Sequence, residues 1–440
     1  MRPTEKRDRT EWEGIPGRNA INIIARDMRV ISPSLPRVYP FVVERGEGVH
    51  LFDVDGNRFL DFAAGAGVMN LGYQNPEVTR AASEQIRRLI HSGSSNFYAE
   101  LPVRFAEKLT ELTGYEQVLF TNSGSEALEA AAKLAMWYAR KRRLISFYKC
   151  IHRGRMLDLP STTREIATGG EEVPGIEISR SHYAYCYRCP LKREYPECGI
   201  ECLNEVENLL ADPEIGNNVA GIMVEPIQYE SGCIVPPDEF HRGLRRICDE
   251  HEILLIADEL VTGAYRTGPF LGMESFNTRA EITAMAGSIG GGLPLGATLS
   301  HTSIMNLPPG THTGTAGGNL VALAAGLAGI EEMKRQDIGK SASKLGAAIV
   351  RRLREMQEDY PPIGDVRGRG LMIGVEIINP NRSPAPLLRD AIIEEAFEAG
   401  LILLPAGDST ITITPPLTIT EEEAETGLNI LENAIQRLKR

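Results

Sequence analysis

The stretch Phe120-Thr-Asn-Ser-Gly-Ser-Glu-Ala127 joins a short apolar run to a strong helical pattern. Val118–Thr121 has the length and composition of a strand, and the helix is predicted from Glu126 to about Arg140. A turn of small residues at a helix start presents free N–H groups and a positive dipole end, which suits a phosphate group. The alternative is that a Ser or Asn only caps the helix. The stretch predicts a strand–turn–helix unit of an α/β fold.

Two more apolar runs, Ala220–Val224 and Ile253–Ala257, extend this pattern. Like Val118–Thr121 they are short, apolar throughout and bounded by polar residues or glycine, which is typical of parallel strands buried on both faces. Asp258 and Glu259 follow the second run, at the strand end where open α/β sheets bind ligands. Adjacent strand residues point to opposite faces, so only one of the two acids can meet a given ligand. A solvated strand end is the alternative.

The flanking regions predict a second, smaller domain. Residues 1–47 read as an irregular charged arm, and residues 48–61 as a hairpin. Residues 77–92, 100–113 and 320–358 have helical spacing, the last as one or two helices. Short strands follow, and Thr420 with Glu423 forms a capping box for the last helix. We expect an arm and part of the small domain in 1–75, a large domain in 76–325 and the rest of the small domain in 326–440.

The composition excludes several classes of protein. The chain has 440 residues and a net charge of −12, so it lacks the basic surplus that nucleic-acid or anionic-membrane binding needs. The charged N-terminus lacks the apolar stretch of a secretory signal, and no run reaches the ~18 apolar residues of a membrane span. We therefore expect a cytoplasmic protein with no nucleic-acid or membrane partner.

Four of the seven cysteines fall within 17 residues, as a Cys-x2-Cys pair and a Cys-x3-Cys pair: Cys186, Cys189, Cys198 and Cys202. The spacing is compatible with a tetrahedral zinc site. Free thiols and disulfides are the alternatives, the latter because intracellular proteins of hyperthermophiles can carry them. The four residues are therefore weak metal-site candidates.

Several segments, in this order, resemble those of the class III aminotransferases, the fold-type I pyridoxal-phosphate (PLP) family of the ornithine, acetylornithine and γ-aminobutyrate enzymes. The resemblance covers the chain from about Gly48 to its end. Its motifs are Leu51–Asn57, Phe120–Ala127, Glu225–Gln228, Ile256–Glu259, Arg266–Gly268, Gly290–Gly296, Gly317–Asn319, Arg367–Gly370 and Pro415–Leu417.

The resemblance implies a fold and a set of site residues. It implies a large domain with a mainly parallel sheet, a small α+β domain from both termini, and a homodimer with its cofactor site at the subunit interface. Gly124 and Ser125 match the positions that bind the cofactor phosphate, and Thr315 matches a threonine that reaches it from the partner subunit. Asp258 matches the partner of the pyridinium nitrogen. Glu230 matches a glutamate on the substrate side, and His152 the histidine of the family's His-Gly pair.

The sequence departs from the family at the residue that carries the chemistry. The family's Schiff-base lysine, which precedes the glycine-rich segment, falls at Gly287, and no lysine occurs between Lys192 and Lys334. A lysine exchanges the imine and moves the proton between substrate and cofactor. Glycine can do neither, so we expect no catalytic residue at this position.

Three other positions have also changed. The ring-stacking aromatic falls at Ile151, the glutamine that binds the phenolic oxygen at Val261, and the arginine that grips the substrate carboxylate at Thr412. These are independent contacts, so their joint loss indicates relaxed selection on catalysis. Any PLP is expected to bind non-covalently and weakly, or not at all.

The leading hypothesis is a class III aminotransferase homologue that has lost catalysis. It would act as a structural or regulatory subunit, as a homodimer or as a hetero-oligomer with an active paralogue. One alternative is a PLP-dependent aminotransferase or amino-acid racemase whose lysine was mutated. Another is a binding module that holds a phosphorylated small ligand on Gly124, Ser125 and Thr315.

Overall fold

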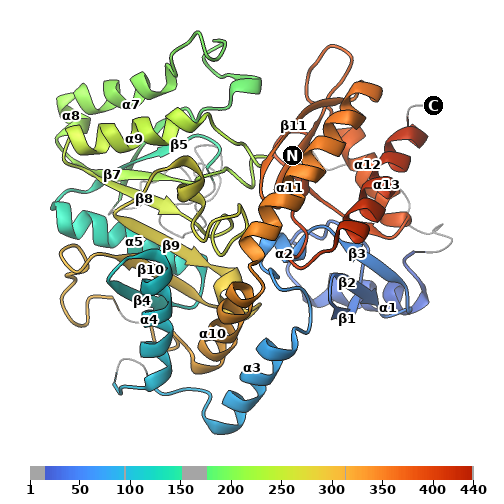
Figure 1. Cartoon of the computed structure of the whole chain (residues 1–440), viewed down its shortest axis with the longest axis horizontal. Coiled ribbons are helices and arrows are strands. Elements are labelled where there is room, and N and C mark those ends of the chain that lie inside the picture. The colour runs from blue at the N-terminus through green and yellow to red at the C-terminus, as the bar shows by residue number, and fades with distance from the viewer. Residues whose placement is uncertain (1–14, 94–95, 151–175, 313, 439–440) are drawn as a thin grey trace.

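The computed structural model describes residues 15–93, 96–150, 176–312 and 314–438. One lobe is built around a large sheet, and the other contains the N-terminal sheet and the C-terminal elements (Figure 1). The chain is therefore a mixed α/β protein with a central, mainly parallel sheet, as the sequence predicts. The domain limits given above stay a prediction.

The large sheet has seven strands, all parallel except one. Only β10 runs antiparallel to its neighbours, β4 and β9. In sheet order the strands are β4 (Gln117–Thr121), β10 (Gly296–Ser300), β9 (Ile282–Ala286), β8 (Leu254–Asp258), β7 (Val219–Val224), β5 (Arg143–Phe147) and β6 (Glu177–Ser181). The three central strands β7, β8 and β9 are buried along their whole length, which explains their continuous apolar sequences.

One predicted strand differs from expectation. The run at Val118–Thr121 was expected to be a parallel strand buried on both faces, but β4 lies at the sheet edge, antiparallel to β10 and only half-buried. An edge strand pairs on one side only, so an apolar sequence alone does not distinguish it from a central strand.

Helices cover the sheet and connect its strands. Helix α5 starts at Gly124, where Ser123 caps it by accepting from the Glu126 N–H. The helices of this region are α3 (Pro76–Arg88), α4 (Glu100–Thr113), α5 (Gly124–Ala139), α7 (Cys202–Ala211), α8 (Pro213–Gly216), α9 (Asp238–Glu250) and α10 (Leu320–Arg335). Three single 3-10 turns are η1 (Cys186–Arg188), η2 (Gly272–Phe276) and η3 (Gly287–Gly290).

The second lobe joins both ends of the chain through two four-stranded sheets. One sheet has the order β1 (Val43–Glu47), β2 (His50–Asp53), β3 (Arg58–Asp61) and β13 (Leu401–Ile402); the other has the order β11 (Ile363–Arg369), β12 (Met372–Ile377), β15 (Thr410–Ile413) and β14 (Leu404–Ala406). Strands β3 and β13 pair in parallel although about 340 residues separate them. Helices α2 (Ala64–Gly67), α11 (Ile338–Asp359), α12 (Pro386–Glu398) and α13 (Glu421–Leu438) complete this part.

Two local predictions in this lobe are confirmed and one is wrong. Residues 50–61 form the β2–β3 hairpin, and Thr420 and Glu423 make the reciprocal capping bonds at the start of α13. The N-terminal arm, expected to be irregular, contains α1 (Arg18–Val30). No proline or glycine interrupts this segment, and the helix end carries exposed apolar residues such as Met28 and Val30.

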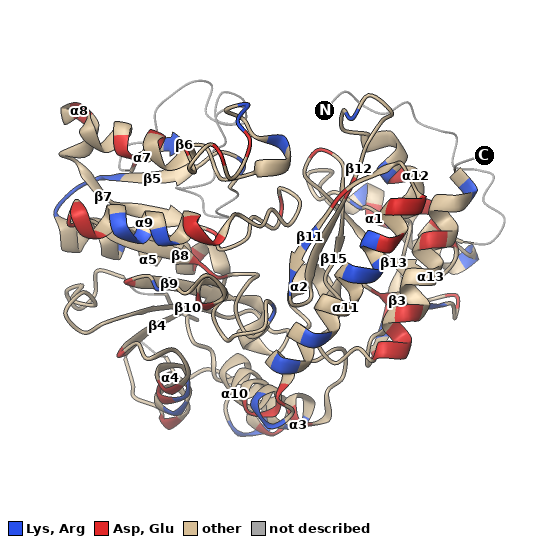
Figure 2. Cartoon of the chain, turned by 45° about the horizontal axis from the view of Figure 1, so that its top comes forward, with Lys and Arg blue, Asp and Glu red and all other residues tan. Residues whose placement is uncertain are grey.

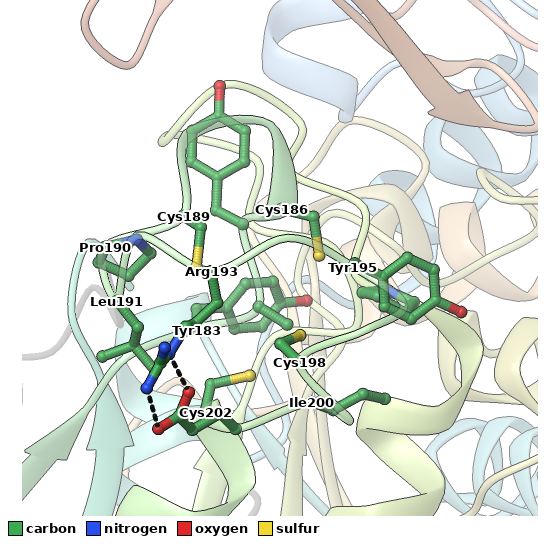
Figure 3. A pocket seen from close by; sticks show the side chains of 14 residues that line it. Tyr183, Cys186, Cys189, Pro190, Leu191, Arg193, Tyr195, Cys198, Ile200 and Cys202 are labelled. Carbon is green, nitrogen blue, oxygen red and sulfur yellow. Dashed lines mark hydrogen bonds and ion pairs between the residues drawn. The ribbon is translucent and has the colours of Figure 1, made fainter.

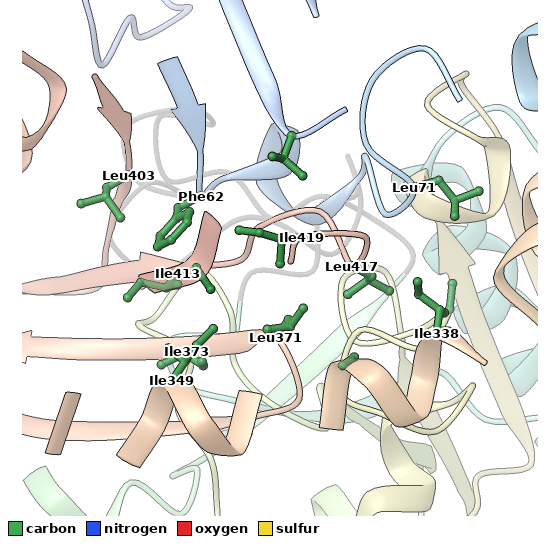
Figure 4. Close-up of a cluster of buried hydrophobic side chains, with 14 of the residues drawn as sticks. Phe62, Leu71, Ile338, Ile349, Leu371, Ile373, Leu403, Ile413, Leu417 and Ile419 are labelled. Carbon is green, nitrogen blue, oxygen red and sulfur yellow. The ribbon is translucent and has the colours of Figure 1, made fainter. Parts of the chain in front are cut away.

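The main apolar core connects the two lobes. Phe62, Leu71, Ile338, Leu371 and Leu417 belong to the same buried cluster, although they come from five separate parts of the chain (Figure 4). Helices α10 and α11 separate at Gln336 and Asp337, whose backbone turns the chain into the second lobe. The two lobes thus share one core rather than a thin hinge.

Charged residues of both signs are interspersed on the surface. Helix α9 carries both signs, and α13 begins with three glutamates (Figure 2). Over the described ranges, no helix combines the length and the apolar character needed to span a bilayer. The expected absence of nucleic-acid and membrane partners stays a prediction.

A buried histidine in α9 predicts acid sensitivity. His241 is fully buried, its Nε2 lies 2.9 Å from the Pro226 carbonyl oxygen, and burial lowers its pKa from 6.5 to about 4. In the unfolded chain His241 is protonated below about pH 6.5, whereas in the folded chain it is protonated only below about pH 4. The free energy of unfolding therefore falls as the pH falls between these values. The shift corresponds to about 3 kcal/mol. We expect His241→Gln, which keeps an N–H donor, to flatten this dependence.

Thermal unfolding of both proteins, followed from neutral pH to about pH 4, measures this contribution. His91, an exposed histidine, supplies the control variant His91→Gln, which should keep the wild-type dependence. Parallel curves for the wild type and His241→Gln would contradict the assignment.

Candidate cofactor site

Three chain segments meet at the carboxyl ends of the central strands. A Cβ atom on Gly124, at the start of α5, would lie 2.3 Å from Cδ2 of Leu260 and 3.2 Å from Cβ of Ala286. Leu260 follows the end of β8, and Ala286 ends β9. The predicted phosphate turn therefore adjoins the two strand ends that carry Asp258 and Gly287, and only a glycine fits at position 124 without displacing Leu260.

The two adjacent acids at the end of β8 play separate parts. Asp258 is 5% exposed, and its Oδ1 accepts from the Leu260 N–H at 3.1 Å. Glu259 is buried and accepts from Thr262 and from the N–H groups of Gly272 and Met273. Burial raises the pKa of Glu259 to about 7. Neighbouring residues of a strand point to opposite faces. Because Glu259 points toward η2 and holds it in place, we expect Asp258 to point toward the ligand side.

The position expected for the lysine has a backbone suited to glycine. Gly287 directly follows β9, its φ is +64°, and a Cβ atom there would lie 3.1 Å from Cγ2 of Val68. An L-residue in this left-handed conformation is strained by about 1 kcal/mol. Val68 follows α2 in sequence but lies against Gly287 in space, a contact that no sequence pattern indicates.

The other changed positions that the structure describes contribute no polar group to a ligand. Val261 packs against a buried cluster that includes Ile227, Tyr229 and Met372. Thr412, in β15, is 1% exposed and donates from Oγ1 to the Leu404 carbonyl oxygen at 3.0 Å. Neither side chain is charged. Ile151 and His152 lie outside the described residues, as does the rest of the His152–Gly154 segment.

The remaining predicted residues lie near the strand ends or at the surface. Glu230 is partly buried in the segment after β7, and its carbonyl oxygen accepts from the Gly407 N–H at 2.8 Å. Ser125 is partly buried in the first turn of α5. Thr315 is exposed in the turn before α10. Their roles in binding stay predictions.

The buried thiol of Cys150, beside this region, was not predicted from the sequence to have a role. The Cys150 thiol donates to Glu225 Oε1 at 3.0 Å, and burial together with this carboxylate raises the pKa of Cys150. The second oxygen of Glu225 accepts from the Tyr229 N–H at 3.1 Å. Glu225 therefore fixes the loop after β7. The position of Glu225 after an apolar strand was visible in the sequence, but its pairing with a cysteine 75 residues away was not.

The whole chain matches one family of known proteins. A family model described as aminotransferase class-III matches residues 32–435. The chain belongs to the class III aminotransferase family. This class III chain is 35% identical to a leucine/methionine racemase of Thermococcus litoralis over 431 residues, which cover 94% of it and 95% of the relative.

Other relatives and a solved structure support the same family. An acetylornithine aminotransferase of Methanosarcina acetivorans is 33% identical over 416 residues, which cover 94% of this class III chain and 96% of the relative. A crystal structure of a Bacillus anthracis aminotransferase superposes with a TM-score of 0.87 at 27% identity, over 95% of this chain and 99% of the other. The fold is thus that of the fold-type I PLP enzymes, and the family uses PLP.

Proposed function

We propose that this class III aminotransferase homologue has lost catalysis and acts as a structural or regulatory subunit. The observation that carries the proposal is the glycine at the end of β9, beside Asp258 and the Gly124 turn. By resemblance, position 287 belongs to the Schiff-base lysine. A glycine has no amine to exchange with a substrate imine and no group to move a proton.

The positions of several other lysines support this proposal. Lys133 donates to the Thr311 carbonyl oxygen, and Lys149 pairs with Asp408 at 2.8 Å. Lys108 and Lys334 both pair with Glu111, and Lys344 pairs with Glu421. Each of these amines already has a partner, and none of these partners belongs to β9 or to the segment that carries Asp258.

The residues fit one part of PLP and not the other. The N–H groups at the start of α5 suit a phosphate, and the buried carboxylate of Asp258 suits a protonated ring nitrogen. Bound PLP would supply an electron sink to a substrate. At position 287 the fit fails, because nothing there can hold the cofactor covalently, so we derive no reaction step through it. We propose weak, non-covalent binding.

The assembly is part of the proposal. Thr315 is exposed on the single chain and matches, by resemblance, a threonine that serves the partner's site. A homodimer, or a hetero-oligomer with an active paralogue, would place it there. Co-purification from the native host tests the second form, and recovery of this chain alone would contradict it.

The alternative of a PLP-dependent aminotransferase or amino-acid racemase whose lysine was mutated is consistent with the relatives. Two of them, from Thermococcus litoralis and Pyrococcus horikoshii, are named amino-acid racemases, and they are 35% and 34% identical. With its lysine restored, such an enzyme would racemise or transaminate an amino acid. Val261 and Thr412 favour the hypothesis of lost catalysis over this alternative. A lysine restored at position 287 would still lack the glutamine and the arginine that the family has at these two positions.

A titration with PLP tests the retained phosphate turn. We expect a change in PLP absorbance that disappears after gel filtration, and about tenfold weaker binding in Ser125→Ala because one hydrogen bond to a charged phosphate is lost. Ser341→Ala, on the exposed face of α11, should bind like the wild type. Equal affinity for PLP in Ser125→Ala would contradict the role of this hydroxyl.

A further inference from the structure

The four clustered cysteines line one small cavity. Cys186 begins η1, Cys189 follows it, and Cys202 is the first residue of α7. With Cys198 they surround a cavity of about 20 Å³, and their sulfur atoms point toward a shared space (Figure 3). A cavity of this volume holds one species the size of a water molecule. All four are free thiols.

The local backbone presents the thiols as two turns. The N–H of Lys192 donates to the Cys189 carbonyl oxygen at 3.0 Å, and the N–H of Cys198 donates to the Glu194 carbonyl oxygen at 2.8 Å. In the second turn Gly199 and Ile200 both have positive φ, which brings Cys198 and Cys202 to the same side. Two cysteine pairs, each with two or three residues between its members, are typical of closed tetrahedral zinc sites.

We propose that Cys186, Cys189, Cys198 and Cys202 bind one Zn²⁺ ion as four thiolates. Each S–H bond breaks as a Zn–S bond forms, the four protons go to water, and no oxidant or reductant takes part. Over the ranges that the structure describes, no three His, Cys, Asp or Glu side chains are arranged as a metal site. Metal binding would therefore require the four sulfurs to rotate toward one another.

Arg193 and Glu201, paired at 2.6 Å, both line this cavity, so a closed ion pair borders the four thiols on one side. A zinc site with four protein ligands has no open position, so its role is structural rather than catalytic.

The zinc would fix a contact between the two lobes. Tyr185, directly before Cys186, and Arg188, directly before Cys189, both bond to Glu376 in β12. Glu376 is 2% exposed and also accepts from Arg367 at 2.9 Å. A metal at the four cysteines would immobilise the segment that delivers Tyr185 and Arg188 to this buried carboxylate. The inference is independent of the proposed loss of catalysis.

Metal analysis of the full-length chain, purified without chelator and with a reductant, tests the proposal. We expect about one zinc ion per chain, and an at least about tenfold loss in the double variant Cys189→Ser/Cys198→Ser, which removes one ligand from each turn. Cys248→Ala, a buried cysteine of α9 outside the cluster, is the matched control and should keep its zinc. A metal-free wild type, or zinc retained by the double variant, would overturn the proposal.

A second measurement uses the unmutated chain and so does not depend on the folding of a variant. Replacement of zinc by Co²⁺ should give the intense thiolate-to-cobalt absorption of a four-cysteine site. Titration with a mercurial, which forms Hg–S bonds in place of the Zn–S bonds, should release the metal as about four thiols per chain are consumed. Disulfides among these cysteines in the freshly purified protein, or bound iron in place of zinc, would also overturn it.

Discussion

Arg266→Met is expected to lower the free energy of unfolding by about 3–5 kcal/mol, because it removes charge-assisted donors from three buried oxygens. Arg266 is fully buried and donates to the carbonyl oxygens of Leu371 at 3.0 Å and Pro415 at 2.5 Å. It also donates to Asn70 Oδ1 at 2.6 Å. These partners come from three separate segments, so the loss affects both lobes together.

The charge of Arg266 persists although burial lowers its pKa to about 10. Urea unfolding followed by circular dichroism measures the change. Arg242→Met is the control, since this α9 residue is half-exposed and pairs with Glu239 only at 3.7 Å; we expect at most about 0.5 kcal/mol there. Equal losses in the two variants would show that Arg266 does not hold the segments together.

Gly287→Lys is expected to leave racemisation and transamination at least about 10²-fold below those of active relatives. The new side chain starts from a backbone with a φ of +64°, beside Val68. It also faces a site in which Val261 packs among apolar side chains and the Thr412 hydroxyl is engaged with Leu404. An amine alone replaces neither missing contact.

Assays with leucine, methionine, alanine, serine and acetylornithine in the presence of PLP measure this activity, with the Thermococcus litoralis racemase as the active reference. Gly310→Lys is the matched control, because Gly310 has a φ of +83° and open space around it. Turnover by Gly287→Lys within about tenfold of the reference would support the alternative of an enzyme with a mutated lysine.

Local chemistry made much of the fold predictable. The β2–β3 hairpin follows from a turn in which Asp53 Oδ1 accepts from the N–H groups of Asp55 and Asn57. The start of α13 follows from its capping box. The central strands β7 and β8 follow from apolar runs that a sheet covered on both faces requires. For the hairpin and the helix start, the deciding contacts lie within a few residues of one another.

The parts that were not predictable depend on contacts between distant segments. The edge position of β4 depends on its pairing with β10, and the approach of Val68 to Gly287 joins segments about 220 residues apart. The same holds for the bond between Cys150 and Glu225. The adjacency of the Gly124 turn to the ends of β8 and β9 was implied by the family resemblance, and the structure places these segments in contact.

Reduction of the wild-type chain with borohydride, after incubation with one equivalent of PLP, tests the central claim most directly. Intact mass spectrometry and peptide mapping would then detect any PLP fixed to a lysine. With Gly287 at the Schiff-base position, we predict no stoichiometric adduct on any single lysine. A stoichiometric adduct on one lysine would show an internal Schiff base and contradict the account.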